Sequence, residues 1–133
     1  MSRCPRGRGP CMNTAQDHLN KAAHNRAFLD SLFVTNANAD WASIVLFYRA
    51  LHLVRAYLHH LGINHGISHG VTNRAVAARF PAAVSVSYLK LYNHSRLYRY
   101  EQLAATVQDF ADLDRNHFRP ALQFVQTALP SAV

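Results

Sequence analysis

Cysteine is nearly absent from this 133-residue chain, and the little there is lies at one end. Cys4 and Cys11 are the only cysteines. Disulfide bonds therefore do not hold most of the chain together. A zinc site at this end would need two histidines at a fitting distance from the cysteine pair, and no nearby spacing supplies them.

Long hydrophobic runs are missing as well. Half of the residues are hydrophobic, which is enough to build a core, but no apolar run approaches the roughly 18 residues that span a bilayer. The first residues, MSRCPRGRGPCMN, are basic and lack the apolar stretch of a signal peptide. These absences predict a cytoplasmic protein with no membrane-spanning segment, and the length predicts a single domain.

The first eleven residues differ in composition from the rest. They hold three arginines, two of the five glycines and two of the five prolines, which is typical of a disordered segment. An amphipathic pattern begins directly after Met12. We predict a disordered basic tail over residues 1–11 and a helical bundle domain over residues 12–133, with Met12 as the natural start unless the tail is a flexible arm.

Acidic residues are missing from the middle of the chain. Residues 41–100 contain no Asp or Glu, but they contain seven Lys or Arg residues and six histidines. A segment with one sign of charge creates a positive field, which attracts phosphate. Alternatively, acids of the flanking segments pack against these cations. The sequence leaves both interpretations open.

Hydrophobic periodicity predicts helices along most of the chain. The predicted helices cover residues 13–33, 40–61, 71–80 and 82 to about 100, and a last helical region from residue 101 is interrupted or kinked before Pro120. Asn13 or Thr14 can cap the first helix, and Asn38 or Asp40 the second. Trp41 is expected to anchor the core. Short connections and the lack of hairpin signals predict an all-α fold, a four- to five-helix up-and-down bundle.

The segment HHLGINHGISHG, residues 59–70, combines histidine with the only glycines after residue 11. Gly62 is expected to end the long helix in a left-handed conformation. Ser68 can cap the next helix, which places His69 in its first turn, bonded to the long helix near His52. His65 and His69 could converge with His59 or His60 on a metal. However, no carboxylate or cysteine is near to complete a site, and arginines repel cations, so we expect no metal and no cofactor.

Four residues are candidates for acid–base catalysis: His52, Arg55, His60 and His69. A metal-independent ribonuclease needs a base for the 2′-hydroxyl, an acid for the leaving 5′-oxygen, and positive charge for the phosphorane, and His and Arg suit these tasks. Alternatively these histidines are structural: a half-buried His52 bonds a carbonyl group, and histidines at the end of the long helix complement its dipole.

Three tyrosines and one arginine follow each other at intervals of four residues along the predicted fourth helix. This ladder can stack exposed bases and bind phosphate, or it can be a packing seam within the bundle or at a dimer interface. Its residues, with two further arginines, are the candidates for nucleic-acid binding: Arg49, Tyr88, Tyr92, Arg96, Arg99 and Tyr100.

The order of these motifs resembles the HEPN superfamily over roughly residues 14–128. The matching positions are Phe47, Tyr48, Ala50 and His52, then Gly62, Ser68, His69 and Gly70, then Tyr88, Leu91, Arg96 and Tyr100. HEPN proteins are small helical bundles, usually dimers. Many are metal-independent ribonucleases of toxin–antitoxin and other defence systems, and others bind RNA or nucleotides without catalysis.

The sequence departs from the nuclease members at one motif. Those members carry Arg-x(4–6)-His near the start of a late helix, whereas here Arg96 is followed by Tyr100 at the fourth place and by no histidine within six residues. Arg55 and His60 have the spacing but lie on the earlier long helix. The resemblance therefore implies a homodimeric binding or regulatory module for RNA or a nucleotide, with an antitoxin or nucleotidyltransferase as a candidate partner. The alternative is a metal-independent endoribonuclease.

Overall fold

The computed structural model describes residues 14–133. The predicted tail and Met12 lie outside the described residues. Helices make up most of the described chain and no strand occurs in it, which confirms the all-α prediction. The elements are α1 (Ala15–Ser31), α2 (Ala39–His60), α3 (His69–Arg79), α4 (Ala82–Tyr100), α5 (Val107–Leu113), η1 (Asp114–Phe118) and α6 (Arg119–Gln126).

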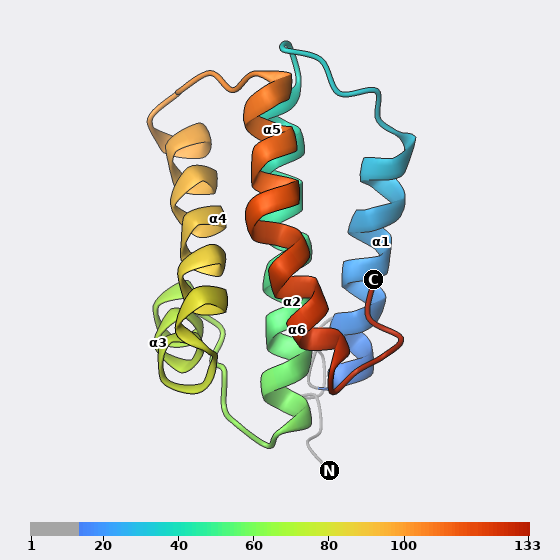
Figure 1. Cartoon of the computed structure of the whole chain (residues 1–133), viewed down its shortest axis with the longest axis vertical. Helices are drawn as coiled ribbons and strands as arrows, with labels where there is room; N and C mark the ends of the chain where they lie inside the picture. The colour runs from blue at the N-terminus through green and yellow to red at the C-terminus, as the bar shows by residue number, and fades with distance from the viewer. Residues whose placement is uncertain (1–13) are drawn as a thin grey trace, which may run out of the picture.

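The long helices alternate in direction, so the bundle is up-and-down as predicted (Figure 1). Helices α1 and α4 flank the central helix α2, and the continuous α5–η1–α6 segment lies in front of α2 in this view, while α3 packs beside the start of α4. The predicted kink before Pro120 is a π-helical turn: the Arg119 N–H donates to the Asp114 carbonyl, five residues earlier. The wider turn keeps the helix continuous up to a proline that has no N–H to donate.

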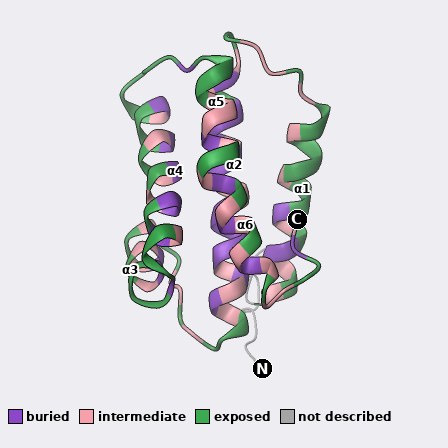
Figure 2. Ribbon diagram, viewed as in Figure 1, coloured by how far each residue is buried: buried purple, intermediate pink, exposed green. Residues whose placement is uncertain are grey.

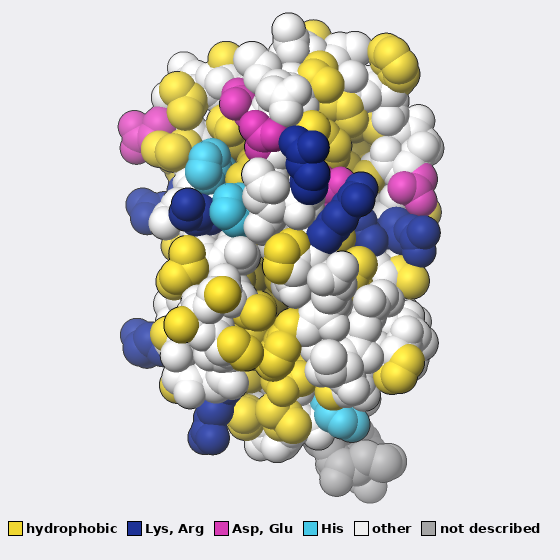
Figure 3. All heavy atoms as spheres, in the orientation of Figure 1, with side chains coloured by type: hydrophobic (Ala, Val, Ile, Leu, Met, Phe, Trp, Pro, Cys, Tyr) yellow, Lys and Arg dark blue, Asp and Glu magenta, His cyan; other side chains and the backbone are white. Residues whose placement is uncertain are grey.

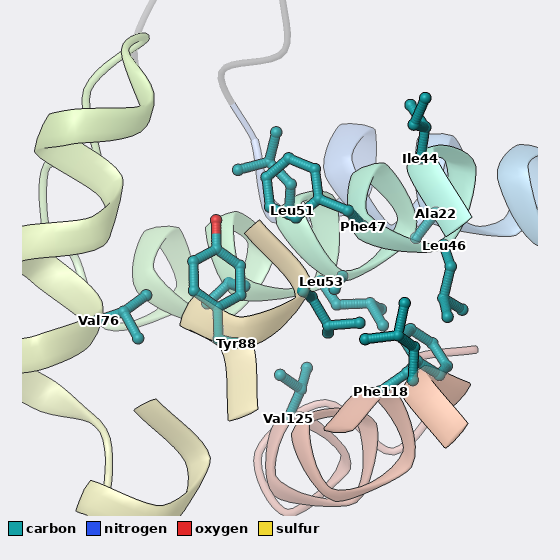
Figure 4. Close-up of a cluster of buried hydrophobic side chains, with 14 of the residues drawn as sticks. Ala22, Ile44, Leu46, Phe47, Leu51, Leu53, Val76, Tyr88, Phe118 and Val125 are labelled. Carbon is teal, nitrogen blue, oxygen red and sulfur yellow. The ribbon is translucent and has the colours of Figure 1, made fainter. Parts of the chain in front are cut away.

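The bundle core lies between α2, α4 and the η1–α6 segment. Figure 4 shows Leu53 of α2, Tyr88 of α4, Phe118 of η1 and Val125 of α6 converging there, and all four are fully buried. Figure 2 shows the buried positions of the helices on their inward sides. Burial of such side chains is the main favourable term in folding.

One side of α2 is not covered in this way. Tyr57 contacts Phe124 of α6, with 5.0 Å between ring centroids. Tyr48 lies nine residues earlier, which is half a turn away at about 100° per residue, so it points to the opposite side. We define the open face of α2 as the residues on that side that are exposed or partly exposed: Trp41, Val45, Tyr48, Arg55 and His59. Trp41 is 63% exposed there, so the prediction that it anchors the core is wrong.

Local signals in the sequence account for the ends of the helices. Thr14 Oγ1 accepts a hydrogen bond from the Asp17 N–H, and Ser68 Oγ accepts one from the Val71 N–H, as predicted. Asn38 occupies the cap position of α2, but its Oδ1 accepts from the Thr35 N–H and so closes the preceding turn instead.

Two glycines shape the connection between α2 and α3. Gly62 has φ +73° and ends α2, as predicted, and Gly66 has φ +68°. Both values lie in the left-handed region that side chains disfavour. A Cβ on Gly66 would also lie 2.6 Å from Val71 Cγ1. The connection therefore has one well-defined path, which fixes the position of His69 at the start of α3.

Candidate nucleic-acid interface

Aromatic rings from three helices meet where α3 begins. The His69 ring lies 5.6 Å from Phe47, 6.2 Å from Tyr48 and 5.5 Å from Tyr92, measured between ring centroids. These distances are those of interacting aromatic pairs. Phe47 is fully buried and forms the floor, whereas His69, Tyr48 and Tyr92 are only partly buried. The first turn of α3 thus places an accessible imidazole between two tyrosines.

Two arginines of α4 lie over tyrosine rings of this region. Arg99 Nη1 donates a hydrogen bond of 2.6 Å to Tyr48 Oη. The Arg99 guanidinium carbon lies 5.5 Å from the Tyr48 ring centroid and 5.0 Å from that of Tyr100. Arg96 lies 5.9 Å from the ring centroid of Tyr92. Such cation–π contacts help to hold a guanidinium in place. We call Tyr48, His69, Tyr92, Arg96 and Arg99 the His69 cluster.

Within the described residues, the arginines of this cluster form no ion pair with an acid. The ion pairs found between residues 14 and 133 are Arg26–Asp30, Arg115–Asp112 and Arg119–Asp114. All of them lie on α1 or on the α5–η1–α6 segment, where Figure 3 shows acidic and basic side chains interspersed. Three of the flanking acids thus pair with flanking arginines, and no described acid forms an ion pair with Arg96 or Arg99.

Burial and charge keep His69 neutral near pH 7. Partial burial lowers the pKa of His69, and the positive charges of Arg55 and Arg99 lower it further. Its Nδ1 is buried and forms no hydrogen bond with the described residues. The expectation that His69 is hydrogen-bonded to the long helix near His52 is therefore wrong: it contacts that helix through the rings of Phe47 and Tyr48.

Arg55 ties the central helix to the start of α3. Its Nε donates to Thr72 Oγ1 over 3.2 Å and its Nη2 to the Ile67 carbonyl over 3.3 Å. Thr72 Oγ1 in turn donates to the His65 carbonyl over 2.9 Å. Arg55 is thus a structural link, and it also contributes its charge to the neighbourhood of His69.

The other two catalytic candidates lie elsewhere. His52 is 8% exposed and faces His18 of α1, with 3.1 Å between their Nδ1 atoms. That position gives a substrate no access to it and corrects the prediction of a catalytic His52. His60 is exposed in the last turn of α2, outside the His69 cluster. The predicted catalytic set is therefore not assembled, and only Arg55 and His69 come together.

Tyr88 and Arg49 do not belong to the interface either. Tyr88 has no exposed surface, and burial raises the pKa of its phenol well above the usual range, so it cannot stack on a base. Arg49 lies 4.2 Å from the ring centroid of Phe118. Burial is the main reason why its pKa is lowered, and the charge of Arg26 lowers it further, whereas Asp114 and Asp30 raise it. Arg49 thus faces α1 and η1 rather than the His69 cluster.

The outer end of the tyrosine ladder borders a shallow hollow. Tyr100 is 69% exposed. With Asn93, Arg96, Leu97 and Glu101 it lines a hollow of about 240 Å³. The ladder therefore divides: its first tyrosine is core packing, and its later members form an exposed surface that combines guanidinium, phenol and amide groups.

No group of three or more His, Cys, Asp or Glu residues between residues 14 and 133 is placed to hold a metal ion. None of the helices in that part of the chain is long and apolar enough to cross a membrane.

Comparison with known proteins adds no relative. A scan against protein-family models finds no match, and neither do searches of curated proteins and of solved structures.

Proposed function

We propose that the protein binds RNA or a nucleotide through the His69 cluster and acts as a binding or regulatory module. The observation that carries this proposal is the pair Arg96 and Arg99, which lie over tyrosine rings and form no ion pair with a described acid. Cations that form no ion pair attract phosphate oxygens, and planar guanidinium groups bind them with two parallel hydrogen bonds.

The aromatic residues suit the base and the ribose of a nucleotide. Tyr100 exposes most of its ring beside Arg99 and can stack on a base. The partly exposed rings of His69 and Tyr92 add a surface on which a ribose or base can pack. The resemblance to the HEPN superfamily supports the same class of ligand. This proposal includes a homodimer, an antitoxin or nucleotidyltransferase partner, and a role in defence. Sedimentation velocity of the purified chain tests whether it is a homodimer.

Binding of a labelled single-stranded oligouridine, followed by fluorescence anisotropy, tests the proposal. The affinity should fall steeply between about 50 and about 200 mM salt, because each phosphate that meets a cation releases condensed counterions. Changing Arg96 and Arg99 together to Gln should weaken binding. It should also reduce the slope of log K against log salt by roughly 0.7 for each arginine that no longer meets a phosphate.

The control variant changes Arg115 and Arg119 to Gln. It removes the same amount of charge, but from two arginines that are paired with acids on the α5–η1–α6 segment. Binding should be nearly unchanged in this variant. Equal losses of affinity in the two variants would show that only net charge matters, and absence of binding at low salt would refute the proposal.

A metal-independent ribonuclease is the second candidate, and His69 favours it. A neutral, partly exposed imidazole next to two arginines can accept a proton from a 2′-hydroxyl. Incubating mixed RNA with the protein in EDTA distinguishes the candidates. Cleavage that disappears in His69→Ala, while the variant remains folded at the assay temperature, would establish the enzyme.

A further inference from the structure

A second group of histidines surrounds His52, the buried residue that lies between Tyr48 and Arg55 on the same side of α2. His18 of α1 and His52 of α2 are 2% and 8% exposed, and their rings stack with 5.3 Å between centroids and an interplanar angle of 27°. His65, from the connection between α2 and α3, meets the His18 ring edge-on at 5.0 Å. We call His18, His52 and His65 the histidine clamp, because they come from three separate segments of the chain.

The short distance between His18 and His52 restricts where protons can sit. Their Nδ1 atoms are 3.1 Å apart, which is a hydrogen-bond distance. A neutral imidazole has one N–H and one lone pair, so one Nδ1 must donate and the other must accept. If both rings become imidazolium, two N–H groups point at each other across this distance. The two rings therefore keep this hydrogen bond when one proton lies between their Nδ1 atoms. They lose it when each Nδ1 carries a proton.

Every charged group among residues 14–133 that acts on the pKa of His52 disfavours a positive charge on its ring. Burial is the main reason why the pKa of His52 falls to about 3, and His18, Arg55, Lys21 and His65 lower it further. These groups belong to α1, to α2 itself and to the connection after α2, and each is a basic residue. Burial also lowers the pKa of His65, as do Arg55 and His59, partly offset by its hydrogen bond to the Gly66 carbonyl.

We propose that the histidine clamp is an acid-sensitive latch that holds α1 and the 61–68 connection against α2 while its rings are neutral and releases them when it takes up protons. The His65 carbonyl accepts from Thr72 of α3, and the Ile67 carbonyl accepts from Arg55. Release of the connection therefore also loosens the start of α3, where His69 lies.

The direction of the effect follows from proton binding. His52 binds a proton more weakly in the folded chain, with a pKa of about 3, than in the unfolded chain, where a histidine has its ordinary value of 6.5. Below about pH 6.5 the unfolded state takes up more protons, so stability is lost as the pH falls from there toward 3. At pH 5 His52 alone lowers the folding equilibrium constant about 30-fold relative to pH 7.5.

Urea unfolding of the full chain at pH 7.5 and pH 5.0 tests the latch. In His52→Asn the amide can replace Nδ1 as a hydrogen-bonding group but does not titrate. Between pH 7.5 and pH 5.0 the folding equilibrium constant of this variant should therefore fall by about 30-fold less than that of the wild-type chain. The control is His24→Asn, which removes an exposed histidine of the same helix as His18 and should keep the full acid effect of the wild-type chain.

Nitrogen NMR of the imidazole rings gives a second measurement that does not depend on a variant folding. At pH 7.5 His18 and His52 should show complementary tautomers, one protonated at Nδ1 and the other at Nε2. His52 should remain neutral at pH 5. Titration of His52 near 6.5, the same tautomer in both rings, or an unchanged acid effect in His52→Asn would overturn the proposal. None of these readouts involves RNA, so the latch and the proposed function stand or fall separately.

Discussion

Replacing Gly62, Gly66 or Gly70 by alanine should have three different effects, although the change is the same each time. Gly62 and Gly66 both have left-handed backbones, with φ +73° and +68°. Alanine in that conformation costs roughly 1–2 kcal/mol. A Cβ on Gly62 meets nothing within 4 Å, whereas one on Gly66 lies 2.6 Å and 2.7 Å from Val71 Cγ1 and Cβ. Forcing atoms into such a contact costs roughly 1–3 kcal/mol more.

We therefore expect Gly62→Ala to lower the free energy of unfolding by about 1–2 kcal/mol and Gly66→Ala by about 2–5 kcal/mol. Gly70 lies in the first turn of α3, and a Cβ there meets nothing within 4 Å. Gly70→Ala should be neutral or stabilising by up to about 1 kcal/mol, because alanine favours helix. Urea unfolding followed by circular dichroism measures all three at one pH.

A double-mutant cycle separates the backbone strain from the steric clash. Val71→Ala removes both methyl groups near Gly66 but leaves the Val71 Cβ at 2.7 Å. The double variant should recover part of the stability that Gly66→Ala removes, and Val71→Ala should recover none of the stability that Gly62→Ala removes. Equal costs for Gly62→Ala and Gly66→Ala, or no coupling with Val71, would refute the reasoning.

Three further changes test the cluster and the core. Tyr88→Phe should change the free energy of unfolding by less than about 1 kcal/mol, because its buried hydroxyl has no hydrogen-bond partner among the described residues; a loss of 2 kcal/mol or more, at the upper end of the cost of about 1–3 kcal/mol for a broken buried bond, would show that a partner exists. Tyr48→Phe should weaken oligouridine binding severalfold, since Arg99 loses the hydrogen bond that positions it; unchanged affinity in anisotropy would exclude that role. His69→Ala should lower the melting temperature by a few degrees, because it removes ring contacts worth about 0.5–1.5 kcal/mol each; an unchanged melting temperature would show that these contacts contribute little.

The helices could be predicted from the sequence because their signals are local. Periodicity predicts the long helices to within a few residues, Thr14 and Ser68 are side-chain caps as expected, and the interruption before Pro120 is present. The positive φ of Gly62 also follows from its place after a helix. Each of these features depends on residues a few positions apart, and so a single sequence contains the information.

The candidate site was harder to predict because it depends on rotation and on distant partners. Residues four apart on a helix are turned by about 40° relative to each other, so the ladder rotates by about 120° from Tyr88 to Tyr100. Its start therefore faces the core and its end faces solvent. His18 was missed as a partner of His52, although it lies three residues after Ala15 and beside Leu19 on the buried side of its helix. Only the tertiary structure brings these two histidines together.

The two halves of the His69 cluster belong to regions that should differ in dynamics. Tyr48, Tyr92 and Arg99 lie on α2 and α4, whose inward sides form the core, so their amides should exchange with solvent mainly through global unfolding. Helix α3 buries only Thr72 and Val76 and is reached through an exposed connection, so His69 should open and close locally. A ligand that touches both halves would slow hydrogen exchange in α3 far more than in α2. The exchange rate of α3 amides therefore reports on occupancy of the cluster even when the ligand leaves no other signal.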